Sequence, residues 1–304
     1  MSGKVFISCG QATDEERNLA SDLRHWFGSQ GFDPYVAIQA QSIQDVNSGI
    51  IAELRKADYY VFVDFPREGF VTHDGKQVRR GSLFTNQELA IAYILGFDKV
   101  LFFQHKDIVL EGLLRYMAAN ATKFEQSSDI VDLVRNAVAA RGWNPRYSRH
   151  LVATNLNWSS QLIQYNNPRG LSLVGRFLYV DIENRRNDIG AVHTVAQLAR
   201  ITYPDNQEVP SPDSSYLKAT TFQGYTHVIR PESRRTFDLL VVCPGSGHIY
   251  LNSSLDVTPL QPIITAPGNY SLHYEVFAES FPVLQFSLRL QVTGDVQSTE
   301  ATLE

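Results

Sequence analysis

Cysteine is almost absent from this chain of 304 residues, which holds only Cys9 and Cys243. Two cysteines so far apart cannot form the framework of a small disulfide-stapled domain. No second cysteine or paired histidine stands near either one at the spacing of metal ligands. We therefore expect free thiols and no structural metal.

Charge is also sparse, and long apolar runs are missing. Charged residues make up 19% of the chain, the formal net charge is −5, and no dense tract of lysine and arginine occurs. This composition gives no electrostatic basis for binding nucleic acid. No stretch has the length of a membrane span, and a predicted strand begins at Lys4, which leaves no room for a secretory signal. We expect a cytoplasmic protein whose partners are neither nucleic acid nor a membrane.

The chain is long enough for two domains, and its 43% of hydrophobic residues is ordinary for a globular protein. Residues 1–142 alternate between apolar strands and helices, the first of which opens with a capping box from Thr13 to Glu16. The expected strands are 4–8, 33–37, 59–65 and 99–103. The expected helices are 14–30, 46–56, a helix that contains Glu88 and ends near residue 95, 107–119 and 128–140. This alternation predicts an α/β domain with a flavodoxin-like doubly wound parallel sheet, whose ligand would lie beyond the carboxyl ends of the strands.

The second half of the chain follows a different pattern. Residues 143–170 are interrupted by asparagine and proline, so we interpret them as a linker or packing segment. Residues 171–295 contain seven short β-rich runs between turn signals, which predict an all-β, immunoglobulin-like sandwich. Residues 296–304 are expected to form a polar, frayed tail.

Glu88 is the one charged residue in the segment 81–92, where every other residue is small, polar or apolar. In a helix, Phe84 lies one turn before Glu88 on the same stripe. A carboxylate in such surroundings can meet a cationic sugar in a water-poor cleft. A structural interpretation also stays open, because Thr85-x-x-Glu88 fits a helix capping box.

Two loops could contribute to the same site. Cys9, Gly10 and Gln11 follow the first strand and lead to a helix N-terminus, where backbone N–H groups can receive a phosphate. The alternative is an ordinary connector, and Cys9 is better explained as a small buried thiol than as a nucleophile. The loop 67–80 carries cationic side chains that could attract phosphates or could simply be solvated, namely His73, Lys76, Arg79 and Arg80.

Three segments resemble a Toll/interleukin-1 receptor (TIR) domain of the bacterial NAD-cleaving kind: Phe6-Ile7-Ser8, residues 58–64, and Ser82-x-Phe84-Thr85-x-x-Glu88. Phe84 and Thr85 stand where that family usually has tryptophan and cysteine. More distantly, the sheet and the glutamate are similar to nucleoside 2-deoxyribosyltransferases.

The resemblance implies that Glu88 is catalytic and that residues around it bind the substrate. The implied substrate-binding residues are Phe6, Ser8, Cys9, Gly10, Gln11, Ser82, Phe84 and Thr85. NAD would be the substrate, and no cofactor is implied. The loop 38–45 matches the position of the family's gating loop. Implied partners are further copies of the chain, stacked through TIR domains, and a downstream effector or a phage-derived trigger.

The sequence thus favours an NAD glycohydrolase or ADP-ribosyl cyclase that acts in bacterial antiphage defence by depleting NAD or by producing a cyclic ADP-ribose signal. One alternative is a nucleoside or nucleotide N-glycosidase or deoxyribosyltransferase, since breaking any N-glycosidic bond develops positive charge on the sugar that a carboxylate can balance. A second alternative is a TIR module without activity that only oligomerises.

Overall fold

The computed structural model describes residues 2–37, 43–71, 73, 75–109, 114–117, 120–166, 172–211, 216–220, 224–251 and 261–304. The chain divides into two compact units, Met1–Ser148 and Arg149–Glu304. Each unit has its own buried core, so each is described by itself.

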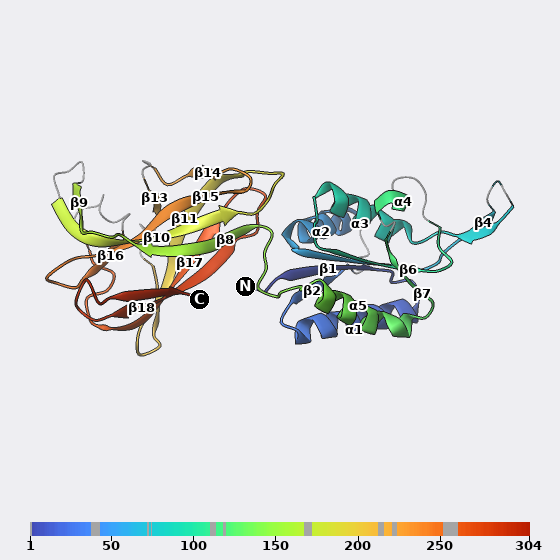
Figure 1. Cartoon of the computed structure of the whole chain (residues 1–304), viewed down its shortest axis with the longest axis horizontal. Helices are drawn as coiled ribbons and strands as arrows, with labels where there is room; N and C mark the ends of the chain where they lie inside the picture. Colours follow the sequence, from blue (N-terminus) through green and yellow to red (C-terminus); the bar gives the residue numbers. More distant parts are fainter. Residues whose placement is uncertain are drawn as a thin grey trace. The chain divides into compact units, whose positions relative to one another are not determined.

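The first unit is built on a sheet of five strands in which every pair is parallel (Figure 1). In sheet order the strands are β2 (Asp33–Val36), β1 (Lys4–Cys9), β3 (Tyr59–Asp64), β6 (Val100–His105) and β7 (Thr122–Phe124). This is the flavodoxin-like order, and it confirms the predicted parallel α/β sheet. The order reverses between β1 and β3, which is where ligands of such sheets bind.

Helices cover both faces of this sheet (Figure 1). The helices of the unit are α1 (Asp14–Ser29), α2 (Ile43–Lys56), α3 (Leu83–Ile94), α4 (Leu114–Met117), the short 3-10 helix η1 (Ser127–Asp129) and α5 (Ile130–Ala140). Strand β1 shows how the sequence assigns the faces, because alternate side chains of a strand point in opposite directions. Val5 and Ile7 pack with α1 and α5, whereas Phe6 packs with α2 and α3.

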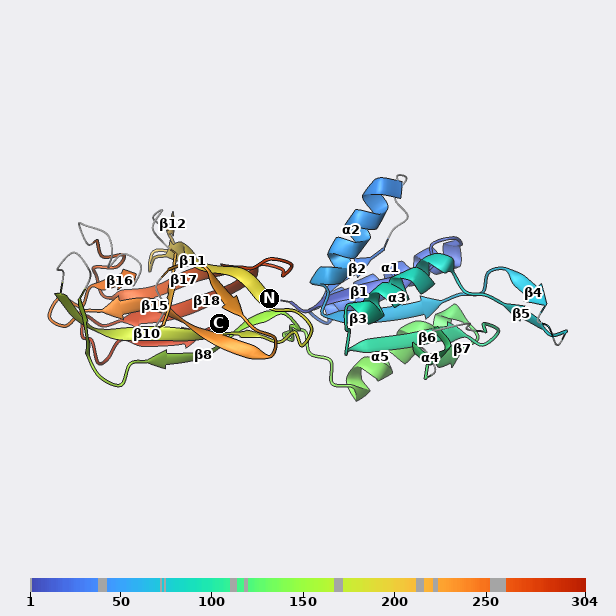
Figure 2. The same cartoon turned by 90° about the horizontal axis from the view of Figure 1, so that it is seen from above.

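Two parts of this unit differ from the expected elements. The helix expected over 107–119 was wrong at its start, because Asp107 lies in a turn and Ile108 makes an isolated β-bridge with Arg79. Of the remainder, Leu114–Met117 forms α4, and residues 110–113 and 118–119 lie outside the described residues. The long loop after β3 contains an antiparallel ribbon of β4 (Gly69–Val71) and β5 (Gln77–Arg79), which extends beyond the sheet (Figure 2). Three-residue strands are too short to produce a readable alternation in the sequence.

The second unit consists of two antiparallel sheets around one shared core. One sheet has the order β13 (Lys218–Ala219), β15 (Ser233–Val242), β10 (Ser172–Asn184) and β8 (Leu151–Trp158), with β16 (Ile249–Leu251) and β9 (Ile163–Asn166) at its side. The other has the order β12 (Glu208–Pro210), β11 (Ala191–Thr202), β17 (Gly268–Phe277), β18 (Leu284–Val292) and β19 (Glu300–Leu303), with β14 (His227–Ile229) beside β11. The all-β prediction is confirmed, and the finer immunoglobulin-like assignment stays a prediction.

Two predicted boundaries were wrong. The segment 143–170, expected to be a linker, contains β8 and β9, and the units divide between Ser148 and Arg149. Strand β8 lies at a sheet edge and packs only part of its side chains against the core, so its apolar alternation is weak. The expected polar tail ends in β19, which pairs with β18 because Ala301 and Leu303 pack against the core.

Candidate active site

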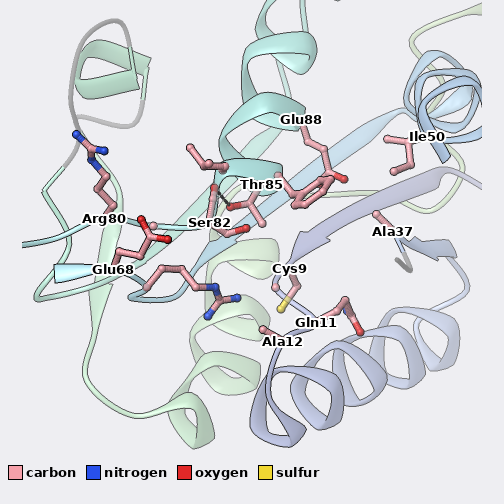
Figure 3. Close-up of a pocket in the computed structure, with 15 residues that line it drawn as sticks. Cys9, Gln11, Ala12, Ala37, Ile50, Glu68, Arg80, Ser82, Thr85 and Glu88 are labelled. Carbon is pink, nitrogen blue, oxygen red and sulfur yellow. Dashed lines mark hydrogen bonds between the residues drawn. The ribbon is translucent and has the colours of Figure 1, made fainter. Parts of the chain in front are cut away.

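A pocket of about 460 Å³ lies at the carboxyl ends of β1 and β3, where the strand order reverses (Figure 3). It is lined by residues from the loop after β1, the end of β2, α2, the loop after β3 and the first turns of α3. The predicted site residues that line it are Cys9, Gly10, Gln11, Ser82, Phe84, Thr85 and Glu88. The structure thus brings the loop after β1 and the start of α3 to one pocket, although they are far apart in the sequence.

Two predicted substrate-binding residues do not line the pocket. Phe6 is fully buried and packs against Tyr35 and Tyr60 in the core beneath α2 and α3. Ser8 is also fully buried. Phe6 and Ser8 are alternate residues of β1 on the face covered by α2 and α3, so this part of the pocket is lined by the loop after the strand instead.

Glu88 lies on α3 and is only 7% exposed. The Ser8 hydroxyl donates a hydrogen bond of 2.5 Å to its Oε2. Burial raises the pKa of Glu88 from 4.5 to about 7, and the Ser8 hydrogen bond acts in the opposite direction. Among the described residues, no lysine, arginine or histidine contributes to this pKa. Within the described part of the chain, Glu88 is therefore a nearly buried carboxylate at the pocket that forms no ion pair.

The capping-box interpretation of Glu88 was wrong. The N-cap of α3 is Ser82, which makes no side-chain capping bond, and Thr85 is the third residue of the helix. Glu88 stands six residues after the N-cap, beyond the reach of a capping interaction. Its carboxylate bonds to a neighbouring strand, not to the helix backbone.

The start of α3 is held from the sheet by Asp64, which sequence reasoning did not select as a site residue. Asp64 is fully buried at the end of β3 and accepts hydrogen bonds from the Ser82 backbone N–H (3.0 Å) and the Thr85 hydroxyl (3.3 Å). Burial raises its pKa from 3.8 to about 6, opposed by these hydrogen bonds and by Arg67. Gly81 lies so close that a Cβ there would collide with the carboxylate. The sequence feature that could have identified Asp64 is its position as a single acid near the end of the apolar run 59–65.

A second buried acid holds a cation at the pocket. Glu16, 2% exposed at the start of α1, binds Arg67, with 2.7 Å between Oε2 and Nη2. Glu16 also accepts the backbone N–H of Ala12 (2.7 Å) and of Thr13 (3.4 Å), which confirms the predicted capping box. These two N–H groups already donate to Glu16, so they are not available to a bound phosphate. Arg67 is the positively charged group at this end of the pocket.

Gly10 allows this arrangement, because a Cβ at Gly10 would collide with both the Arg67 guanidinium and the Glu16 carboxylate. Arg80 also lines the pocket and stacks on the Phe70 ring at 4.6 Å. Figure 3 shows Arg80 and Glu68 at one end of the pocket, away from Gln11.

The remaining predicted residues differ in how exposed they are. Phe84 is 57% exposed and lies at the pocket surface beside Leu83, which is also exposed. Burial raises the pKa of the Cys9 thiol far above its ordinary value, so Cys9 is a neutral thiol and not a nucleophile. Most of the predicted gating loop 38–45 lies outside the described residues. Within the described part of the chain, no group of three or more metal-ligating side chains is found.

Comparisons with known proteins give only distant similarities. No protein-family model matches the chain, and no curated protein matches it. A CMP N-glycosidase from Clostridium botulinum is similar in structure, with 12% identity and a TM-score of 0.32 over 44% of this chain and 98% of that one. A 2-deoxyribosyltransferase from Bacillus psychrosaccharolyticus gives 16% identity and a TM-score of 0.29 over 42% of this chain and 90% of that one. A GH3 beta-glucosidase from Bifidobacterium adolescentis gives 10% identity and a TM-score of 0.27 over 99% of this chain and 49% of that one. In the described part of the chain, no helix is long and apolar enough to cross a membrane.

Proposed function

We propose that the first unit breaks the N-glycosidic bond of a nucleoside or nucleotide, with Glu88 as the catalytic residue. The observation that carries this proposal is the position of Glu88: nearly buried, at a pocket, and without a cationic neighbour among the described residues. The two similar enzymes named above for N-glycosidic or deoxyribosyl chemistry act on the same kind of bond, but the proposal rests on Glu88 and not on their likeness.

The chemistry follows from where charge develops. When the bond between the sugar C1 and the base nitrogen breaks, its electron pair leaves with the base and positive charge develops on the sugar. A Glu88 carboxylate would stabilise that charge, or would attack C1 and form a glycosyl-enzyme that water or a second base then resolves. Water would add its hydroxyl to C1, and its proton would go to the nitrogen of the departing base. A low-dielectric pocket strengthens the interaction between Glu88 and the sugar.

The size of the pocket favours a single nucleoside or nucleotide. Its volume of about 460 Å³ lies in the lower half of the range of small-molecule sites. Arg67 and Arg80 would then meet a phosphate or the sugar hydroxyls, and the exposed Phe84 ring would stack on the base.

NAD is the second candidate substrate, and the mixed charge of the pocket favours it. Glu88 and Glu68 would face the positively charged nicotinamide, while Arg67 and Arg80 would meet the two phosphates. Nicotinamide leaves without needing a proton, so one carboxylate would suffice. Hydrolysis or cyclisation of NAD, a role in antiphage defence, assembly of several copies and a phage-derived trigger all stay predictions from the TIR resemblance.

The test is a substrate panel with products resolved by mass. The purified full chain would be incubated separately with ribonucleosides, deoxynucleosides, nucleoside monophosphates and NAD. Free base with a sugar phosphate would indicate a nucleotide N-glycosidase, base exchange a transferase, and ADP-ribose or its cyclic form an NAD-cleaving enzyme. Glu88→Gln should lower turnover at least about a hundredfold because it removes the charge and keeps the shape.

Glu125→Gln is the matched control, because Glu125 pairs with Lys106 on the exposed surface and does not line the pocket. Its turnover should equal that of the unmodified chain. Absence of turnover on the whole panel by a folded protein would overturn the proposal and would leave the non-enzymatic oligomerisation module as the better interpretation.

A further inference from the structure

Glu88 is held by a group that belongs to the sheet beneath it. Resting on the proposed function, we propose that Ser8 is a positioning residue, whose hydroxyl holds the catalytic carboxylate of Glu88 from strand β1. Ser8 would act through Glu88 and would not contact the substrate.

The geometry separates this role from substrate binding. Ser8 is fully buried and does not line the pocket, yet its hydroxyl donates to Glu88 at 2.5 Å. A hydroxyl has one proton, and that proton is committed to Oε2 of Glu88. This bond fixes the side chain of Glu88 from a rigid strand, which is a more precise support than a loop would offer.

Among the described residues, the titratable groups whose pKa is raised by the Glu88 charge are Cys9 of β1, Tyr35 of β2 and Tyr60 of β3. Burial is the largest cause of the raised pKa of each, so all three are neutral at neutral pH. The charged groups that line the same pocket are Arg67, Glu68 and Arg80. Because no cation among the described residues opposes the effect of burial, the Ser8 hydroxyl is the group that keeps a useful fraction of Glu88 ionised at neutral pH.

The decisive measurement is the pKa of Glu88 itself. It can be measured by carbon-13 NMR on protein labelled at its glutamate carboxyl groups, and Glu88→Gln assigns the signal of Glu88. Ser8→Ala should raise this pKa by roughly one unit, the usual effect of a hydrogen bond to a charged group. The acidic limb of the pH–rate profile should move upward by the same amount, while KM stays unchanged. The NMR measurement needs no turnover, so it tests the role of Ser8 even if the proposed reaction fails.

Ser127→Ala is the matched control, because the Ser127 hydroxyl also donates to a carboxylate, that of Glu15, but on the exposed surface and away from the pocket. It should leave the pKa of Glu88 unchanged. If Ser8→Ala lowers the folded fraction, a comparison of Ser8→Thr with Ser8→Val carries the test, because these two side chains have the same shape and only threonine keeps the hydroxyl.

Three results would overturn this role of Ser8. The first is an unchanged Glu88 pKa in Ser8→Ala. The second is a raised KM with an unchanged pKa, which would return Ser8 to substrate binding. The third is an equal Glu88 pKa in Ser8→Thr and Ser8→Val, which would show that the hydroxyl has no effect on Glu88.

Discussion

Glu88 is expected to destabilise the fold that carries it. Between pH 4.5 and about 7 the folded protein retains a proton on Glu88 that the unfolded chain has lost, so the free energy of unfolding decreases as pH rises through this window. Glu88→Gln removes that penalty. At about pH 8 we expect the variant to be more stable than the unmodified chain by roughly 1–3 kcal/mol, and at about pH 4 we expect little difference, as measured by urea unfolding.

Glu53→Gln provides the control of opposite sign. Burial acts to raise the pKa of Glu53, but hydrogen bonds and charge from Lys4 and Lys56 hold it below its ordinary value. Its stabilising effect is present above that ordinary value and is lost as pH falls through the lowered pKa, so removing it should destabilise the protein at about pH 8. A Glu88→Gln variant that is equally or less stable at pH 8 would contradict the assigned penalty.

Phe84 should affect substrate binding more than folding. Its ring is 57% exposed and lines the pocket, so truncation removes little buried area from the core. Phe84→Ala should raise KM severalfold with a nearly unchanged melting temperature, and Phe84→Trp should be tolerated because stacking is retained. Tyr93→Ala is the matched control, since Tyr93 is an exposed aromatic residue of α3 that does not line the pocket. Equal KM values for all three variants would remove Phe84 from the site.

At the scale of elements, the position of α3 depends on Asp64 of β3. Asp64 accepts hydrogen bonds from the Ser82 N–H just before α3 and from the Thr85 hydroxyl in its first turn, so it ties the start of the helix to β3. Asp64→Ala should cost roughly 1–3 kcal/mol of stability at about pH 4, because the Ser82 N–H loses its acceptor, whereas the Thr85 hydroxyl keeps the Ser82 carbonyl at 3.0 Å. Above about pH 6 the loss should be smaller, because the variant also removes the cost of ionising a buried carboxyl. Asp64→Ala should also lower kcat, since Glu88 is carried by the same helix.

Asp129→Ala is the matched control for that prediction. Asp129 is the N-cap of α5 but makes no side-chain capping bond and is exposed. Its replacement should change stability by no more than about 0.5 kcal/mol. Chemical denaturation of both variants at one pH decides the comparison, and an equal small effect for both would show that Asp64 does not anchor α3.

At the scale of the whole molecule, the first unit should fold without the second. It contains a complete five-stranded parallel sheet, and within the described residues no strand of that sheet comes from beyond Ser148. Residues 1–148 should therefore unfold cooperatively in a thermal scan. A disordered fragment by circular dichroism would contradict independent folding.

The activity of that fragment tests the predicted assembly of several copies. If copies must meet to complete the site, specific activity should rise with protein concentration and should recover when an oligomerising tag is fused to the fragment. Constant specific activity at every concentration would show that one copy holds a complete site.

The sequence by itself determined the elements whose signals are local. The capping box at Thr13 and Glu16, the apolar strands β1 and β3, and the helix around Glu88 are specified by near neighbours and by period, so they were predicted with the right type and place. Strands β8 and β19 were missed because an edge strand that is half exposed shows little apolar contrast.

Only the tertiary structure decided what the side chains of the site do. The sequence placed Ser8 near the substrate, while the alternation of β1 under α3 turned it toward Glu88. The sequence left open whether Glu88 caps its helix, and its position six residues after the N-cap, with a contact to a strand 80 residues away, excludes the cap. Asp64 and Arg67 were not selected because their partners are distant in the chain. Burial, hydrogen bonding and pKa depend on such long-range contacts, which no local pattern encodes.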